Sequence, residues 1–316
     1  MNKLITSAMD SRLIVKRSLP DGNIALVSPF HFCIKGLETA TLCRDEEDYD
    51  VFIKYIYITA YKCNVIVIIH TVVSNHAHVA LLARSREDVD KYGVELKRVQ
   101  SMWIRKKYGD ISILHRVDVS ITSIDSMKYA RNVLAYIPKN ALDNGVNDII
   151  SYRWGGCRAM FVYEPYRMNK CKKVCELTTR AMEKIFHTGA DLSGTDWLLD
   201  EGLALEPRSA CDYNYFEMVY NNDQSFFLRM IGTVNDCDIR FDQAIMKMRL
   251  SDTDFMKSAE NYAGQWFGLS VQQLSPKQKA QFLKYLGKKL YLTIPQVARC
   301  FRMERDLVRA ILGRTD

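Results

Sequence analysis

Two histidines separated by one residue are the part of this chain best suited to chemistry. His76 and His78 lie in segment 71–82, whose apolar and β-branched residues predict a β-strand. Side chains two residues apart on a strand point to the same face, so the two imidazoles project together and Ala77 faces the opposite side. Two neutral imidazoles side by side can hold one divalent metal ion. The alternative interpretation is a strand with two surface histidines and no ligand.

A tyrosine and an asparagine one helical turn apart form a second candidate. Apolar residues in segment 127–140 recur at helical spacing, which predicts a helix. Tyr136 and Asn140 are i and i+4, so they share one face of that helix. A tyrosine one turn from an amide oxygen can present a nucleophile and a third metal ligand to one point. The alternative is an ordinary amphipathic helix whose tyrosine packs at the edge of the core.

Three short motifs follow one another in a recognisable order. Residues 75–78 read Asn-His-Ala-His, residues 136–140 read Tyr-Ile-Pro-Lys-Asn, and residues 151–154 read Ser-Tyr-Arg-Trp. They match the Asn-His-x-His signature, the Tyr-Ile-x-x-Asn motif and the Tyr-Arg-Trp box of the single-tyrosine HUH transposases. Residues 28–36 and 45–52 are similar to the opening strand and the acidic start of the first helix in that family. Over residues 28–160 the chain therefore resembles the REP-associated tyrosine transposases.

The resemblance implies a function and a site. Tyr136 would be the nucleophile, with His76, His78 and Asn140 as ligands of Mg²⁺ or Mn²⁺. The activity would be that of a metal-dependent single-strand DNA endonuclease and strand transferase, which acts on hairpin DNA through a 5′-phosphotyrosine intermediate. Tyr129 is the substitute nucleophile if the match is shifted along the helix.

Departures from the family pattern support other hypotheses. Ala141 stands where the family usually has proline after the motif asparagine, Pro138 lies inside the motif, and residues 114–118 lack the usual glycine. They favour a catalytically inactive, domesticated DNA-binding regulatory protein of the same fold. A third hypothesis is a rolling-circle replication initiator or relaxase, which shares the histidine pair but usually places the tyrosine differently.

The predicted elements alternate between strands and helices. They are strand 30–36, helix 46–61, strands 64–73 and 76–83, helix 87–108, strand 114–124 and helix 126–142. This order predicts an α+β fold, a ferredoxin-like split βαβ sandwich with an antiparallel sheet. With helices on one face, the other face of the sheet would stay open. His76 and His78 would lie there on a central strand, beneath the last helix.

The charge is concentrated at the C-terminal end. Residues 271–316 hold ten lysines and arginines and three acids, which accounts for the whole formal net charge of +7. Two short amphipathic segments around Arg302 predict a helix-turn-helix that binds duplex DNA, with Arg305 and Arg309 facing the groove. Leu307, Val308 and Ile311 would face inward. The alternative is a basic helical cap that packs on the main domain.

We expect three regions: a nuclease domain at 1–165, a helical connecting region at 166–270 and the helix-turn-helix unit at 271–316. Single-stranded or hairpin DNA is the expected partner of the first region, and a homodimer is possible because one tyrosine alone aligns. The residues expected to contact DNA are basic or aromatic: Lys97, Arg98, Arg105, Lys106, Lys107, Arg116, Arg131, Arg153, Trp154, Arg302, Arg305 and Arg309.

Composition places the chain among cytoplasmic globular proteins. Hydrophobic residues make up 48% and charged residues 26% of its 316 residues. The sequence holds no apolar run of about eighteen residues, so no membrane span is expected, and residues 1–10 lack a signal-peptide pattern. Nine scattered cysteines predict reduced thiols. Cys171 and Cys175 could be half of a zinc site, but we expect ordinary thiols there.

Overall fold

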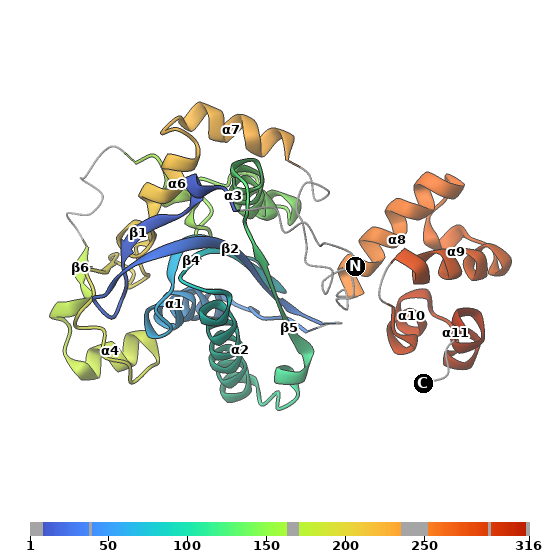
Figure 1. Ribbon diagram of the computed structural model, residues 1–316. Coiled ribbons are helices and arrows are strands. Elements are labelled where there is room, and N and C mark those ends of the chain that lie inside the picture. The colour runs from blue at the N-terminus through green and yellow to red at the C-terminus, as the bar shows by residue number, and fades with distance from the viewer. Residues whose placement is uncertain (1–8, 38–39, 163–170, 235–251, 290–291, 314–316) are drawn as a thin grey trace, which may run out of the picture.

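A curled antiparallel sheet organises the first part of the chain in this computed structural model (Figure 1). The structure describes residues 9–37, 40–162, 171–234, 252–289 and 292–313. The strand order is β1-β2-β4-β3, and β5 also pairs with β2. The strands are β1 (Val15–Ser18), β2 (Ile24–Gly36), β3 (Ile66–Val72), β4 (His76–Ala83) and β5 (Val117–Ser123).

Two helices cover one face of the sheet, α1 (Glu46–Lys62) and α2 (Arg86–Tyr108). Asp45 and Ser85 cap their N-termini, because each side chain accepts a hydrogen bond from a backbone N–H three residues on. Gly109 ends α2 in the left-handed conformation, with φ of 71°. On this face Phe32, Val79 and Leu81 pack against Leu96, Trp103 and Ile104 of α2.

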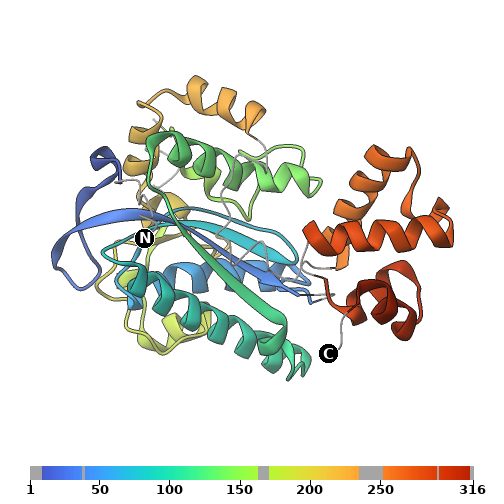
Figure 2. The ribbon, with the colours of Figure 1, turned by 45° about the vertical axis from the view of Figure 1, so that its right-hand side comes forward.

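A further group of helices covers the opposite face (Figure 2). These are α3 (Met127–Asp143), α6 (Tyr213–Val219) and α7 (Gln224–Thr233). Ile69, Ala80 and Leu82 of the sheet share a core with them. The expectation of an open face is therefore wrong, because α3 packs on β3 and β4 and α6 packs on β3.

The sequence patterns located the elements around the histidines closely. The predicted strand 76–83 and helices 46–61, 87–108 and 126–142 are confirmed to within one residue at each end. Pro138 does not end the last helix, which continues to Asp143. Strand β2 begins six residues before its predicted start, and β1, which pairs with that extension, was not predicted.

Residues of the expected connecting region, 166–270, pack in the cores on both faces of the sheet. Helix α4 (Thr179–Phe186) and strand β7 (Leu198–Leu199) contribute Met182, Phe186 and Leu199 to the core of α1, and β7 pairs with the exposed strand β6 (Lys172–Lys173). A short helix, α5 (Pro207–Ala210), leads to α6. The predicted boundary between residues 165 and 166 lies outside the described residues.

The C-terminal helices have a core of their own. They are α8 (Asp252–Phe267), α9 (Pro276–Lys289), α10 (Ile294–Phe301) and α11 (Arg305–Leu312). Phe255 and Ala259 of α8 pack in one cluster with Phe282 of α9, Val297 of α10 and Val308 of α11. The predicted boundary between residues 270 and 271 lies between α8 and three helices with which α8 shares this core.

Two further expectations concern the whole chain. In the described ranges, no helix is long and apolar enough to cross a membrane. The eight cysteines that lie in those ranges are all free thiols, including Cys171 and Cys175.

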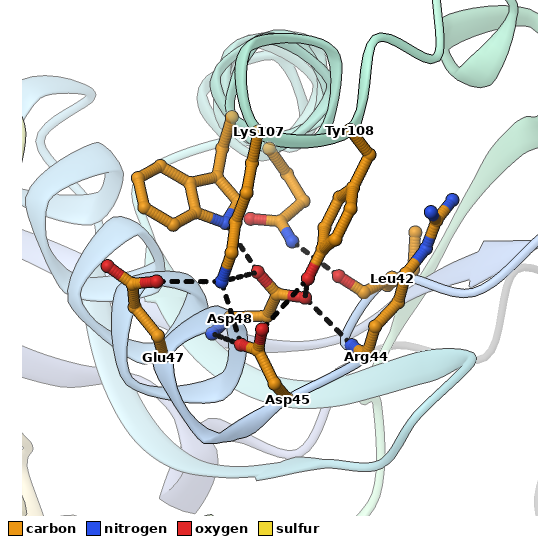
Figure 3. Close-up of polar contacts among 9 residues, drawn as sticks. Leu42, Arg44, Asp45, Glu47, Asp48, Lys107 and Tyr108 are labelled. Carbon is orange, nitrogen blue, oxygen red and sulfur yellow. Dashed lines mark hydrogen bonds and ion pairs between the residues drawn. The ribbon is translucent and has the colours of Figure 1, made fainter.

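A buried carboxylate joins the start of α1 to the end of α2 (Figure 3). Asp48 is fully buried. It accepts hydrogen bonds from Trp103 Nε1 at 2.8 Å, the Tyr108 hydroxyl at 2.7 Å and Lys107 Nζ at 3.0 Å. The backbone N–H of Arg44 donates a fourth bond at 2.8 Å. Burial raises the pKa of Asp48, but these hydrogen bonds outweigh it and hold the pKa below its usual value.

We expect Lys107→Met to lower the free energy of unfolding by about 1–3 kcal/mol at neutral pH, since Asp48 loses a charged donor. Lys106→Met is the matched control, because Lys106 is exposed on the same helix; its effect should stay within about 0.5 kcal/mol.

Folding lowers the pKa values of Asp45 and Asp48 below 3.8. The stabilisation is therefore present above that value and is lost as the pH falls through the folded pKa values. Urea unfolding at neutral and acid pH measures both effects, and equal losses in the two variants would contradict the role of Lys107.

Candidate active site

The two histidines of β4 point to the same face, as the sequence predicted. Ala77 packs with the α1 and α2 core. Ala80 and Leu82 stand two and four residues after His78, so they share its face of the sheet, and they pack beneath α3. His76 and His78 are 6% and 4% exposed. The imidazoles therefore lie in a closed layer between the sheet and α3, and they are not surface histidines.

Helix α3 places its tyrosine and asparagine over these imidazoles. The Nε2 atom of His76 lies 2.8 Å from Oδ1 of Asn140. The ring of Tyr136 meets the ring of His78 edge to face, with centroids 5.3 Å apart. Tyr136 and Asn140 are each 6% exposed. The structure thus brings together all four residues that the sequence nominated for one site.

Both ring nitrogens of His76 lie within hydrogen-bonding distance of an amide oxygen. Its Nδ1 lies 2.7 Å from Oδ1 of Asn75, an oxygen that can only accept. Oδ1 of Asn140, 2.8 Å from Nε2, also only accepts. A neutral imidazole has one N–H, so His76 donates to one of these two amides and turns a lone pair toward the oxygen of the other. With the proton on Nδ1, Nε2 and Oδ1 of Asn140 are two lone-pair donors side by side, an arrangement that a cation between them would stabilise. Asn144 Nδ2 donates to the backbone carbonyl of Asn140 at 2.8 Å and lies 3.4 Å from its Oδ1. Asn144 therefore contacts both the backbone and the side-chain oxygen of Asn140.

Burial keeps two imidazoles of this layer neutral. It lowers the pKa of His31 to about 4. Burial is also the largest cause for His78, followed by the charges of His76, His31 and Lys35, and the pKa of His78 falls well below 6.5. Neutral imidazole is the form that can bind a metal ion, through whichever ring nitrogen carries no proton.

His31 belongs to this layer, although the sequence offered no partner for it. Its Nε2 lies 3.0 Å from Nδ1 of His78, and the two rings stack with centroids 5.2 Å apart. Tyr136 approaches the same ring with a centroid distance of 6.4 Å. A signal was present in the alternation Phe30-His31-Phe32, which turns His31 away from the apolar face. The pairing of β2 with β4 brings His31 to His78, and no local sequence pattern indicated that pairing.

One pair of the expected ligands, His76 and Asn140, has the spacing of two ligands on a small divalent cation. Two ligands at right angles on Mg²⁺ or Mn²⁺, each about 2.1 Å from the ion, lie about 3 Å apart, close to the 2.8 Å between His76 Nε2 and Asn140 Oδ1. In the described part of the chain, no group of three or more His, Cys, Asp or Glu side chains could hold a metal ion. The set of His76, His78 and Asn140 is of another kind, with two imidazoles and one amide oxygen.

Most basic residues expected to bind DNA are not beside this site. Lys97, Arg98, Arg105, Lys106 and Lys107 belong to α2, which covers the opposite face of the sheet. Arg98 bonds Glu95 at 2.7 Å. Lys107 is held by three carboxylates at 2.7 to 3.0 Å. The structure therefore separates this basic helix from Tyr136 by the thickness of the sheet.

The other candidates of the first region take part in specific contacts. Arg116 pairs with Asp110, and Arg131 on α3 donates to the Val219 carbonyl at 3.0 Å. Arg153 lies over the Trp154 ring, 4.5 Å from its centroid. The Trp154 ring also stacks on Tyr49, with centroids 5.1 Å apart, and Arg153 pairs with Glu46 at 3.1 Å. Trp154 and Arg153 thus sit near the start of α1.

The C-terminal candidates lie on exposed surface. Arg302, Arg305 and Arg309 are exposed, and Arg309 pairs with Asp306 at 2.6 Å. Val308 is buried as expected, but Leu307 is 51% exposed, so the expectation that it faces inward is wrong. Successive helix positions are about 100° apart, and the buried face of α11 is centred on Val308, Ile311 and Leu312, so Leu307 lies at its edge.

We compared the chain with protein-family models, curated proteins and solved structures, and none of the three comparisons gave a match.

Proposed function

We propose that this chain is a metal-dependent single-strand DNA nicking and joining enzyme of the tyrosine transposase type. The observation that carries the proposal is the convergence of His76, His78, Asn140 and Tyr136 from two distant segments, with His76 Nε2 2.8 Å from Asn140 Oδ1. The family resemblance assigned these four residues to one site, and their meeting in one layer supports the proposal.

The strand order supports the same proposal. Strands β2, β3, β4 and β5 stand in the order β5-β2-β4-β3 with antiparallel neighbours, and helices α1 and α2 follow β2 and β4. This is the arrangement of a split βαβ sandwich. We assign the first region to the ferredoxin-like fold on this basis, with β1, α6 and α7 as additions. The fold places the histidines on the central strand β4.

Tyr136 would be the nucleophile. Its phenol oxygen forms a bond to the scissile phosphorus, and the bond between phosphorus and the 3′ oxygen breaks. The phenol proton is transferred overall to the leaving oxygen, which gives a 5′-phosphotyrosine and a free 3′-hydroxyl. The reverse reaction with another 3′-hydroxyl rejoins the strand without a nucleotide cofactor. Since one tyrosine aligns, joining two ends needs two protomers or sequential use of one.

His76, His78 and Asn140 would hold Mg²⁺ or Mn²⁺ beside that tyrosine. The ion supplies a positive charge that polarises the phosphate and offsets charge on its non-bridging oxygens. Asn75 would orient His76 through the contact between Asn75 Oδ1 and His76 Nδ1. Edge contact with His78 limits the directions that the Tyr136 ring can take.

The closure of this layer favours a second candidate function. Tyr136 is 6% exposed, so a DNA strand reaches its hydroxyl only after α3 or a neighbouring segment shifts. A protein that binds DNA without cleaving it would keep the fold and need no such movement. A domesticated regulatory DNA-binding protein is therefore the alternative.

The C-terminal unit would bind duplex DNA. Helices α10 and α11 are joined by a tight turn, with Arg302 in the left-handed conformation at φ of 52°. We propose that they form a helix-turn-helix, in which α11 enters the major groove. Arg302 and Arg305 would contact phosphates, and Leu307 would add an apolar contact.

We expect Tyr136→Phe to abolish a covalent adduct with single-stranded hairpin DNA in the presence of Mn²⁺, because the variant lacks the attacking oxygen. Hairpin binding should change little, since the phenol contributes little to contacts with the backbone. A denaturing gel detects the adduct, and a mobility-shift assay measures binding.

Tyr129→Phe is the matched control for that experiment, since Tyr129 lies two turns earlier on α3 and is also buried. It should retain the adduct. An adduct that persists in Tyr136→Phe and disappears in Tyr129→Phe would transfer the role to Tyr129. No adduct in the parent protein, with hairpin binding intact, would favour the regulatory alternative.

A second expectation concerns duplex DNA. Arg305→Gln should weaken duplex binding and lower the slope of log Kd against log salt concentration by about one, because each lost phosphate contact releases one fewer counterion. Lys91→Gln is the control, since Lys91 is exposed and pairs with Glu87 on α2. Fluorescence anisotropy over a salt series measures both slopes. An unchanged slope in Arg305→Gln would show that the C-terminal helices are a structural cap.

A further inference from the structure

One buried histidine has no part in the chemistry described above. His31 lies in the middle of β2, where Phe30 and Phe32 on either side point into the α1 and α2 core. It faces α3 instead and is 3% exposed. Burying a polar ring is unfavourable unless it is hydrogen-bonded, so the partner of this imidazole indicates why a phenylalanine does not occupy the position.

That partner is a proposed metal ligand. Strand β2 pairs with β4 so that Cys33 lies opposite His78, which places His31 diagonally across from the same histidine. Nε2 of His31 and Nδ1 of His78 are 3.0 Å apart. Two neutral imidazoles at this distance form one hydrogen bond, in which one ring donates its N–H and the other accepts it on a nitrogen lone pair.

The direction of the shared hydrogen bond decides what His78 can do. If His78 donates its Nδ1–H, its Nε2 is left with a lone pair. If His31 donates, His78 accepts on Nδ1, and its Nε2 carries the proton and cannot bind a metal. Ligand histidines usually donate their second N–H to a neighbour that fixes the tautomer and the ring. Asn75 occupies the corresponding position beside His76.

We propose that His31 is a positioning residue that accepts the Nδ1–H of His78 and thereby keeps Nε2 of His78 available to a divalent cation. This inference rests on the proposed function of the site. His31 and Asn75 then have the same task on two neighbouring ligands, one from β2 and one from the residue before β4. The stacking of the His31 and His78 rings, at an interplanar angle of 27°, holds the ring plane as well.

Three substitutions test the acceptor separately from the volume of the ring. The oxygen of glutamine stands as many bonds from Cβ as Nε2 of histidine, so His31→Gln can accept from His78. His31→Asn has the same amide on a shorter side chain, and His31→Leu has no acceptor. His70→Leu is the control for losing a buried histidine. His70 is fully buried, and its Nδ1 lies 2.9 Å from the Tyr57 hydroxyl. It lies opposite Val79 in the pairing of β3 with β4, and not opposite His78.

The first measurement is Mn²⁺ affinity of the full chain, by titration calorimetry. We expect His31→Leu and His31→Asn to weaken binding by about 10- to 100-fold, the usual effect of losing such a partner. His31→Gln should bind within a few-fold of the parent. His70→Leu should unfold at a lower temperature but keep its Mn²⁺ affinity. Equal affinities in the parent and His31→Leu, or equal losses in His31→Gln and His31→Leu, would overturn the proposal.

The second measurement needs no metal. Long-range ¹⁵N–¹H NMR reports which ring nitrogen of His78 carries the proton. We expect the Nδ1–H tautomer in the parent and in His31→Gln, so the proposal stays testable if His31→Leu does not fold. An Nε2–H tautomer in the parent would overturn it. A parent protein with the Nδ1–H tautomer but without Mn²⁺ binding would instead contradict the proposed function, because then the ring is oriented and no metal site exists.

Discussion

The structure depends on a strand that is buried on both faces. All eight residues of β4 are buried, and their alternation divides them between two cores. Ala77, Val79 and Leu81 pack toward α1 and α2, and the residues between them pack toward α3. A slip of one residue would exchange the two sets and would place both imidazoles in the apolar core of α1 and α2. The hydrophobic pattern therefore fixes the register, and the register fixes the direction of the histidines.

The second requirement is that α3 lies directly over those histidines. Residues far along the chain hold it there: the Tyr220 hydroxyl donates to the Arg131 carbonyl at 2.7 Å, and Arg131 donates back to Val219 at 3.0 Å. Lys139 reaches the Val234 carbonyl. These bonds anchor α3 from the side away from the sheet. They also explain how the helix tolerates Pro138, since its position does not depend on its own backbone hydrogen bonds alone.

The local part of this architecture could be predicted from sequence. Alternation in β4 and helical spacing in α3 identified His76, His78, Tyr136 and Asn140, because each pattern needs only a few neighbouring residues. The family resemblance predicted that His76 meets Asn140, 64 residues on, whereas the other contacts between distant segments could not be predicted. His31 meets His78 through strand pairing, and α6 and α7 cover α3 through side chains with no local signature. Leu307 was placed on the wrong face because short amphipathic helices leave the boundary of the apolar face uncertain within one residue.

The central claim is that two imidazoles and one amide of this buried layer form a metal site beside a tyrosine. Crystals of the full chain grown or soaked with Mn²⁺ test it most directly, because manganese gives an anomalous signal that locates the ion independently of the protein atoms. We expect one peak within coordinating distance of His76 Nε2, His78 Nε2 and Asn140 Oδ1, about 2.0–2.3 Å from each. Manganese bound elsewhere, with these three side chains unchanged and empty, would contradict the claim.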